Sequence, residues 1–304
     1  MDEVYHIPAM LQETIEGLNI KPDGVYVDVT FGGGGHSRAT LQRMDSISDL
    51  SFDIGHLYSF DQDKDALQNA IDDPKWTFVH SNFRYLRNWM DYYGIEKIDG
   101  LLADLGVSFH HFDCPERGFS FRFSAPLDMR MNQTAKRTAA DIVNGYSEEE
   151  LAKIFYLYGE LKNGRGIAKN ICKARSQKPI ERTEDLVAAS RIPAEMSKEL
   201  ARLFQALRIE VNDEMGALRE MLVAARDLLK PGGRIAILTY HSLEDRLVKN
   251  FLRSGNLEGT IEKDFYGNNL SPFTLIEKGR EASEEEVARN PRARSAKLRV
   301  AEKK

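Results

Sequence analysis

The sequence has few cysteines, no long apolar run and no excess of positive charge. Cys114 and Cys172 are its only cysteines, and they lie far apart without metal-ligand spacing, so we expect two free thiols and no metal site. No apolar run approaches the ~20 residues that a membrane helix needs, so we expect no contact with a membrane. The formal net charge of −5 excludes a protein coated in positive charge but leaves room for local basic patches.

The ends and the bulk composition are those of an ordinary globular protein. The first residues have neither the basic stretch nor the apolar stretch of a secretory signal, so a cytoplasmic location is expected. At 304 residues, 42% hydrophobic and 29% charged, the chain has room for one large or two modest domains.

Four consecutive glycines follow a short apolar strand that ends in Asp28. Glycine has no Cβ and tolerates positive φ, so Gly32 to Gly35 can press bare backbone against a ligand. The helix predicted for Ser37–Met44 adds free N–H groups and a favourable dipole end. The segment therefore predicts a site for the polar end of a nucleoside-type cofactor in a doubly wound α/β fold. The alternative, a flexible surface turn, is less favoured because four glycines are costly to order.

The glycine spacing separates two classes of cofactor. A dinucleotide fingerprint would need a third glycine where Ser37 stands. The loop instead resembles the acid-x-x-x-Gly-x-Gly loop of S-adenosylmethionine (SAM) methyltransferases.

Acids end the second and fourth predicted strands. Asp61 follows the strand His56–Phe60 and lies 26 residues beyond Gly35. A carboxylate at this place can accept two hydrogen bonds from a ribose diol, although Asp61 could also be a cap for the helix predicted at 64–71. Asp104 follows at the end of strand four, predicted for 98–107, and should face both cofactor and substrate.

Phe83 comes shortly after the third predicted strand, Thr77–His80. It could stack on an adenine ring or pack under the next helix, predicted for Arg84–Tyr93, and the sequence leaves both readings open.

From about Cys114 the pattern changes from alternating strands and helices to a loop rich in Phe and Arg and then several helices. These helices are predicted at Thr138–Asn144, Ser147–Tyr158, Ile167–Ser176 and Arg182–Ser190. A long amphipathic helix is predicted over about Ser197–Leu229, and Lys230-Pro-Gly-Gly233 is predicted to turn into a last strand, Arg234–His241. We therefore expect an α/β domain of residues 1–113 and 198–304 with a mostly helical insertion, residues 114–197.

Nine motifs, in order along nearly the whole chain, resemble the bacterial small-subunit ribosomal RNA methyltransferase H family, which methylates N4 of a cytosine in the decoding centre of 16S rRNA. They are His6-x-Pro8-Ala-Met-Leu-x-Glu13, Asp28-x-Thr-Phe-Gly-Gly-Gly-Gly-His-Ser37, Asp104-Leu-Gly-Val-Ser108, Arg117-Gly-Phe-Ser-Phe121, Pro126-Leu-Asp-Met-Arg-Met131, Tyr158-Gly-Glu160, Phe204-Gln-Ala-Leu-Arg-Ile209, His241-Ser-Leu-Glu-Asp-Arg246 and Asn290-Pro-Arg-Ala-Arg-Ser295. The resemblance implies a SAM-dependent class I methyltransferase sheet (Rossmann-like), with the helical insertion recognising RNA.

The resemblance also implies which residues hold SAM. They are Gly34, Gly35, His36, Asp61, Phe83 and Asp104, with His111 standing where the family has a glutamine. An imidazole still makes one hydrogen bond, so His111 is carried as a SAM contact. The family's Tyr-Gly-Glu-Glu-Arg pattern is Tyr158-Gly-Glu160-Leu-Lys here, which leaves the role of the missing charges unassigned.

The implied reaction needs a weak nucleophile, the cytosine N4, aligned with the methyl donor. Acceptors for the amine hydrogens would raise electron density on nitrogen, and by position these are Asp104 and, second, Asp128. Asp104 could equally hold the SAM amino group, which is the role we favour. A general base is not required, since the proton can leave after transfer, so His36, His111 and His241 are not favoured as bases.

Candidate RNA contacts occur outside the sheet pattern. Phe119, Phe121 and Phe123 could stack on bases, or simply pin the insertion to the core. Two segments, 162–182 and 289–304, each hold seven Lys or Arg against one acid and could track phosphates.

Two rival readings stay open. A SAM enzyme acting on another nucleic acid is one, although Asp104-Leu-Gly-Val107 lacks the prolines typical of DNA amino-group methyltransferases. A non-catalytic RNA-binding assembly factor is the other, against which the intact glycine loop counts. The expected partners are 16S rRNA and the small ribosomal subunit, and a homodimer is among the assemblies that the sequence leaves open.

Overall fold

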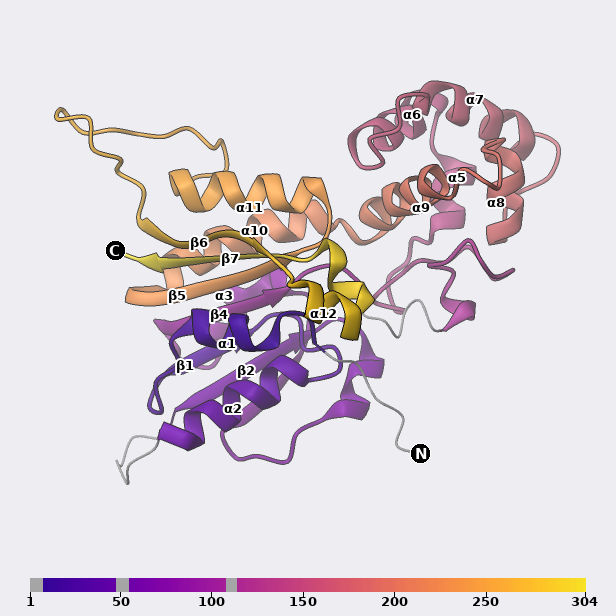
Figure 1. The fold of residues 1–304 in the computed structure, drawn as a ribbon. Helices are drawn as coiled ribbons and strands as arrows, with labels where there is room; N and C mark the ends of the chain where they lie inside the picture. The colour runs from indigo at the N-terminus through magenta and orange to yellow at the C-terminus, as the bar shows by residue number, and fades with distance from the viewer. Residues whose placement is uncertain (1–7, 48–54, 108–113) are drawn as a thin grey trace. The chain divides into compact units, whose positions relative to one another are not determined.

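A computed structural model describes residues 8–47, 55–107 and 114–304 and divides the chain into two compact units (Figure 1). The sheet unit contains Met1–Gly106 and Gly216–Lys304, and the helical unit contains Val107–Met215. The boundary differs from the sequence expectation, which ended the insertion at residue 197. Residues 198–215 belong to the helical unit because Leu203, Phe204 and Leu207 are buried in its core.

The sheet unit is built on seven strands in the order β3-β2-β1-β4-β5-β7-β6. Their bounds are β1 Val25–Asp28, β2 His56–Asp61, β3 Trp76–His80, β4 Ile98–Asp104, β5 Leu229–Thr239, β6 Phe273–Glu281 and β7 Lys297–Lys303. The first five are parallel, and β7 is antiparallel to both β5 and β6. This confirms the predicted doubly wound α/β sheet of the class I methyltransferase type, in which the order reverses between β1 and β4.

Helices cover both faces of this sheet, with α1 and α2 on one face and α10 and α11 on the other (Figure 1). The elements are α1 Leu11–Leu18, α2 Gly35–Ile47, η1 Lys64–Asn69, η2 Phe83–Tyr85, α3 Leu86–Tyr92, α10 Glu214–Leu228, α11 Ser242–Ser254, α12 Glu284–Arg289 and η4 Pro291–Ser295. Two expectations were wrong in detail. The helix predicted at 64–71 is a 3₁₀ helix, and the one predicted at 84–93 begins as the 3₁₀ turn η2, because Asn82 caps that turn.

Strand β5 is longer than predicted. It already begins at Leu229 and therefore includes Lys230-Pro-Gly-Gly233, which the sequence placed in a turn. Gly232 adopts a φ of +78°, and the register with β4 shifts between Ile98 and Gly100. A bulge of this kind lets a strand continue through residues that would otherwise end it.

The helical unit contains η3 Pro115–Arg117, α5 Ala139–Gly145, α6 Glu148–Leu157, α7 Gly164–Arg175, α8 Thr183–Ser190 and α9 Ser197–Asn212. The helix predicted at Ser147–Tyr158 is α6, and its start is a capping box of Ser147 and Glu150. One core holds the unit together, and Phe155 and Leu203 are fully buried in it.

The single helix predicted over 197–229 is two helices, α9 and α10. Asp213 ends α9 in the left-handed conformation, with φ 47° and ψ 45°. A sequence pattern that is apolar at helical spacing on both sides hides such a break, because Asp tolerates the left-handed region without a glycine.

None of the helices in the described ranges is both long enough and apolar enough to cross a bilayer.

Candidate functional site

The carboxyl ends of β1, β2, β3 and β4 meet at one edge of the sheet unit, where open α/β sheets bind ligands. Asp28, Asp61 and Asp104 are the last residues of three of these strands. The backbone N–H of Asp104 donates to Thr30 Oγ1 across 2.6 Å, which ties the end of β4 to the segment after β1. The structure therefore brings the predicted acids to the same edge.

The glycine loop crosses this edge in a conformation that side chains would not allow. Gly32 and Gly34 have φ values of +51° and +75°. A Cβ at Gly34 would lie 2.9 Å from the buried Phe31 ring, and one at Gly35 would lie 2.8 Å from Pro8 Cγ. Helix α2 starts at Gly35, so its first N–H groups lie directly beside bare backbone. The loop can hold the polar part of a ligand through backbone contacts alone.

Asp28 fastens this loop to the sheet. Its carboxylate is 1% exposed and accepts from Ser37 Oγ at 2.6 Å and from the Thr30 N–H at 3.0 Å. Burial raises the pKa of Asp28, and the hydrogen bond from Ser37 opposes that rise. Ser37 also contacts Ser59 Oγ at 2.8 Å, so Asp28 acts through the scaffold rather than toward a ligand.

Asp61 braces the same loop from β2. One carboxylate oxygen accepts from the Gly32 N–H and the other from the Asp63 N–H, each at 2.8 Å. The residue is half-buried at the carboxyl end of β2, as expected. Its predicted contact with a ribose diol stays a prediction.

Asp104, at the end of β4, is a second acid of this edge whose pKa is raised. Its side chain is 24% exposed, and Tyr240 donates a phenolic hydrogen bond to Oδ1 across 2.6 Å. Burial raises the pKa of Asp104 to about 7, the hydrogen bond from Tyr240 works against the rise, and the charge of Glu244 adds to it. A carboxyl in this state changes charge near neutral pH, which makes it a functional candidate on physical grounds.

His36 lies beside Asp104 and is 5% exposed, with Nδ1 3.7 Å from Asp104 Oδ2. Its Nε2 contacts the Ala9 carbonyl oxygen at 3.2 Å. A carbonyl oxygen only accepts, so Nε2 carries the hydrogen and Nδ1 is the acceptor of the neutral ring. Burial lowers the pKa of His36, which favours that neutral ring. His36 and Asp104 together form a pair of acceptors that suits a cationic N–H donor.

Phe83 stands at the start of η2, directly after β3, and is half-buried. Asn82 holds it there by accepting from the Arg84 N–H at 2.9 Å and donating to Gln62 Oε1 at 2.8 Å. The remaining predicted SAM contact, His111, lies outside the described residues.

Sequence reasoning missed Tyr240 and Glu244. Tyr240 follows the carboxyl end of β5, and Glu244 Oε2 accepts from its N–H at 3.0 Å. His241 caps α11 with Glu244 in a reciprocal pair through its Nδ1, and its buried Nε2 lies 3.0 Å from Glu244 Oε1. The signal was present, because a residue just after β5 must lie at the same sheet edge as Asp104.

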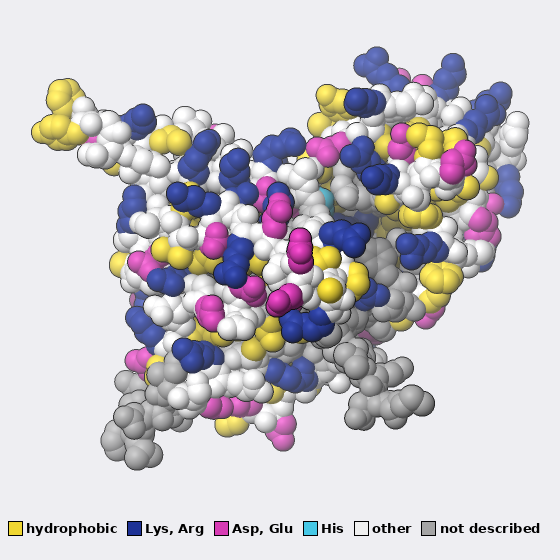
Figure 2. Space-filling view, viewed as in Figure 1, with side chains coloured by type: hydrophobic (Ala, Val, Ile, Leu, Met, Phe, Trp, Pro, Cys, Tyr) yellow, Lys and Arg dark blue, Asp and Glu magenta, His cyan; other side chains and the backbone are white. Residues whose placement is uncertain are grey.

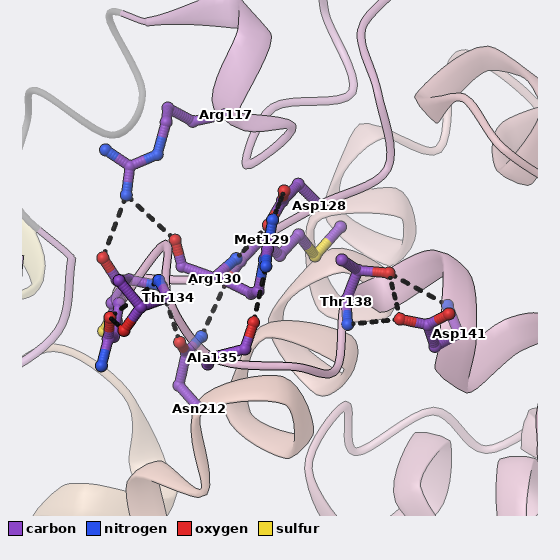
Figure 3. Close-up of polar contacts among 11 residues, drawn as sticks. Arg117, Asp128, Met129, Arg130, Thr134, Ala135, Thr138, Asp141 and Asn212 are labelled. Carbon is purple, nitrogen blue, oxygen red and sulfur yellow. Dashed lines mark hydrogen bonds and ion pairs between the residues drawn. The ribbon is translucent and has the colours of Figure 1, made fainter.

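In the helical unit, Asp128 is held by Arg130. The guanidinium donates from Nε to Oδ1 and from Nη2 to Oδ2, both at 2.7 Å, and the Arg130 N–H adds a third bond at 3.0 Å (Figure 3). Such a two-point pair fixes the carboxylate in place. The catalytic role predicted for Asp128 stays untested.

The same loop is strained and well supported. Met129 is fully buried with a φ of +61°, which is rare for a residue with a side chain. Asn212 donates to the Met129 carbonyl and accepts from the Met131 N–H, both at 2.8 Å, and Arg117 Nη2 donates to the Arg130 carbonyl at 2.9 Å (Figure 3). Two sequence motifs, Arg117–Phe121 and Pro126–Met131, thus form one structural piece. A buried residue held at positive φ by several hydrogen bonds makes this loop a candidate functional segment.

The three phenylalanines of this region differ in exposure. Phe119 is 4% exposed within the helical core, and Phe121 packs edge-on against Phe204 at 5.7 Å. Phe123 is 48% exposed. The structure therefore favours the packing reading for the first two and leaves Phe123 available for a ligand.

The whole chain is similar to known proteins of one family. Residues 3–304 match the sequence model of the MraW methylase family. Proteins named "Ribosomal RNA small subunit methyltransferase H" from Phocaeicola vulgatus and Parabacteroides distasonis are 58% and 59% identical over 306 and 307 residues, covering 99% of this chain and 98% of each relative. The relative from Cytophaga hutchinsonii is 50% identical over 99% of this chain and 100% of its own length.

Proposed function

Because this chain belongs to the MraW methylase family, we propose that it transfers a methyl group from SAM to 16S rRNA of the small ribosomal subunit, at N4 of a decoding-centre cytosine. The observation that carries the proposal is the full-length identity of 50–59% to proteins named as small-subunit rRNA methyltransferases. The glycine loop and the carboxyl of Asp104, whose pKa is raised, support a cofactor site at this edge of the sheet. The cytosine N4 is the finer part of the proposal and rests on the family resemblance.

The residues at the sheet edge fit SAM. The glycine loop has a conformation that a Cβ at Gly34 would not allow, because it would meet the Phe31 ring, and the loop lies beside the first N–H groups of α2. His36 Nδ1 and Asp104 offer acceptors for the amino group of the cofactor. Asp61 at the end of β2 would hold the ribose, and Phe83 after β3 would lie along the adenine.

Bound SAM supplies an electrophilic methyl group on a sulfonium. The residues of the chain then have three tasks: to orient the cofactor, to place N4 in line with it, and to exclude water. In this proposal Asp104 binds the cationic end of the cofactor, and the backbone after it would accept a hydrogen from the incoming amine. No residue needs to remove a proton before transfer, because the protonated product loses it to water afterwards.

Asp128 is the second acceptor that the sequence nominated. Arg130 already donates hydrogen bonds to both carboxylate oxygens of Asp128. A direct part of Asp128 in methyl transfer would therefore require this pair to open. The target base must be unpaired or flipped out to reach a buried methyl group, and we assign recognition of the surrounding RNA to the helical unit, where Phe123 and Arg122 are exposed. A cytoplasmic location and an assembly of two copies stay predictions.

The proposal is tested by incubating the protein with labelled SAM and either unmethylated small subunits or naked 16S rRNA. The RNA is digested and its nucleosides are identified by mass. We expect N4-methylcytidine from the subunits and none with Asp104→Asn. Methylation of another nucleoside would overturn the target atom. SAM binding without transfer to either RNA would favour another nucleic acid as substrate, and loss of both would favour an RNA-binding assembly factor.

A further inference from the structure

An arm formed by residues 256–272 leaves the sheet unit between α11 and β6 (Figure 1). Its tip carries Phe265, 97% exposed, and Tyr266, 86% exposed, with ring centroids 5.6 Å apart. Figure 2 shows hydrophobic side chains at the end of the arm. Two large aromatic rings in open solvent do not stabilise the fold, and exposed apolar side chains of this kind often mark a binding surface.

The tip is an ordered turn. Asp264 Oδ1 accepts from the backbone N–H groups of Tyr266 at 2.9 Å and Asn268 at 2.8 Å, and Oδ2 accepts from Asn268 Nδ2 at 2.8 Å. These hydrogen bonds lower the pKa of Asp264, and the bond from the Asn268 side chain has the largest effect. Below the turn, the Leu270 N–H donates to the Glu262 carbonyl at 2.9 Å. These polar contacts hold the backbone of the turn that carries the two rings.

The base of the arm is fixed to helix α11. Asn269 Nδ2 donates to the Arg253 carbonyl at 3.2 Å, and Ser271 Oγ donates to the Leu252 carbonyl at 3.3 Å. Gly255 ends α11 with a φ of +82°, and a Cβ there would lie 2.2 Å from Pro272 Cδ. Only glycine fits this position, so the arm starts at a defined place on the helix end.

Helix α11 presents a basic face that leads to the arm. Arg246, Lys249 and Arg253 are exposed and are spaced by three and four residues, so they share one side of the helix. Lys and Arg side chains gather over this region in Figure 2.

We propose that the arm and the basic face of α11 form a second RNA-binding surface, in which Phe265 and Tyr266 stack on unpaired bases and Lys249 and Arg253 contact phosphates. Exposed aromatics beside a cationic track are the combination that binds single-stranded RNA. Glu258 and Glu262 on the stem of the arm are exposed acids, which places the phosphate path along α11 rather than along the stem. The inference rests on the proposed function for the identity of the RNA.

This surface is remote from the cofactor edge. Helix α11 begins just beyond the carboxyl end of β5 and its 13 residues run back by about 20 Å. The arm then projects from the opposite end of the sheet. It can anchor the substrate but cannot touch the reacting base, so removing it should raise the KM for the subunit and leave kcat unchanged.

The first test is the double variant Phe265→Ala/Tyr266→Ala with unmethylated small subunits. We expect the KM for subunits to rise about tenfold, as for the loss of base stacking, with kcat and SAM affinity unchanged. Tyr92→Ala, which removes a 75% exposed ring elsewhere in the sheet unit, is the matched control and should change nothing. An unchanged KM in the double variant overturns the proposal.

Leucine replacements separate RNA from a protein partner. Phe265→Leu/Tyr266→Leu keeps apolar bulk but loses the flat rings, so stacking predicts a KM close to that of the alanine variant. A KM close to wild type, or a dimer that dissociates only in the alanine variant, would assign the tip to a protein pocket or to a second copy and overturn RNA stacking.

A binding test without methyl transfer keeps the inference distinct from the proposed function. The full chain is titrated into a fluorescent 12-nucleotide oligouridine over a range of salt. Lys249→Gln/Arg253→Gln should make the log–log salt slope shallower by about 1.4, from about 0.7 per lost phosphate contact. The alanine tip variant should bind the oligonucleotide about tenfold more weakly. These results would stand if no rRNA were methylated, whereas equal binding by all variants would overturn the surface.

Discussion

Tyr240 donates its phenolic hydrogen to Asp104 across 2.6 Å, joining two residues that are 136 positions apart in the chain. The bond connects the ends of β4 and β5 at the point where the cofactor is expected. It also works against the burial that raises the pKa of Asp104 to about 7. Tyr240 is therefore a positioning residue that keeps the carboxylate charged.

Tyr240→Phe should move the pH dependence of SAM binding upward. A hydrogen bond to a charged group contributes about 1.5–3 kcal/mol, and its loss should raise the pKa of Asp104 by about 1–2 units at about 1.4 kcal/mol per unit. Calorimetric titration with SAM between pH 6 and 9 measures the midpoint. A purely structural Tyr240 would weaken binding equally at every pH, which would contradict this assignment.

Asp104→Asn should weaken SAM binding at least about tenfold at pH 8, because the amino group of the cofactor loses a charged partner. The difference from wild type should narrow at pH 6, where the wild-type carboxyl is itself protonated. Circular dichroism of the variant checks that the fold is kept. Equal affinities at pH 8 would remove Asp104 from the cofactor site.

The same carboxyl should make the free protein less stable as pH rises. Its folded pKa is raised from 3.8 to about 7, so between these values the native state binds more protons than the unfolded state, and the free energy of unfolding falls with rising pH. The stabilising difference is complete below pH 4 and lost as pH passes through 7. Denaturant unfolding at pH 5 and pH 8 should show a loss on the order of 2 kcal/mol in wild type that Asp104→Asn lacks.

Gly34→Ala should damage the cofactor loop more than a matched change elsewhere. Gly34 and Gly232 have similar φ values of +75° and +78°, but a Cβ at Gly34 meets the Phe31 ring at 2.9 Å whereas Gly232 has nothing within 4 Å. Gly232→Ala should cost about 1 kcal/mol of stability through its backbone alone. Gly34→Ala should cost about 2–3 kcal/mol and abolish measurable SAM binding. Similar SAM affinities in the two variants would show that the loop tolerates a side chain.

Asp128→Asn tests the second predicted acceptor. Because Arg130 holds both carboxylate oxygens, we expect the melting temperature to fall by a few degrees and kcat for methyl transfer to fall less than tenfold. Arg130→Gln, which breaks the same pair from the other side, should behave alike. A loss of 100-fold or more in Asp128→Asn alone would give this carboxylate a direct part in the reaction.

Local sequence patterns correctly predicted the features that depend only on residues close together in the chain. The glycine loop, the acids at the ends of β2 and β4 and the start of α6 at Ser147 all depend on residues within one turn or strand end, and the structure places them as expected. Asp61 has one contact that was not predicted, because its carboxylate accepts a hydrogen bond from the Gly32 N–H and so helps to fix the glycine loop.

Contacts across long stretches of sequence escaped prediction. The bonds from Tyr240 to Asp104 and from Asn212 to Met129 depend on the packing of distant elements. The break at Asp213 was hidden because its two flanking helices are amphipathic at the same spacing. The antiparallel pair β6 and β7 was not predicted. Strand β6 is mostly exposed or half-buried and contains several charged residues, so it lacks the apolar pattern of a buried strand.

The Ala9 carbonyl contacts His36, and Pro8 lies against Gly35. The residues that support the cofactor loop therefore include a segment before the first strand, outside the glycine motif. Met10 is in turn held by Glu286, whose carboxylate accepts from its N–H at 3.2 Å. Loss of the Glu286 carboxylate should therefore disturb the segment that supports His36, although Glu286 lies far from the glycine loop in the sequence. A survey that defines the cofactor site by its glycines alone would miss the effect of such a substitution.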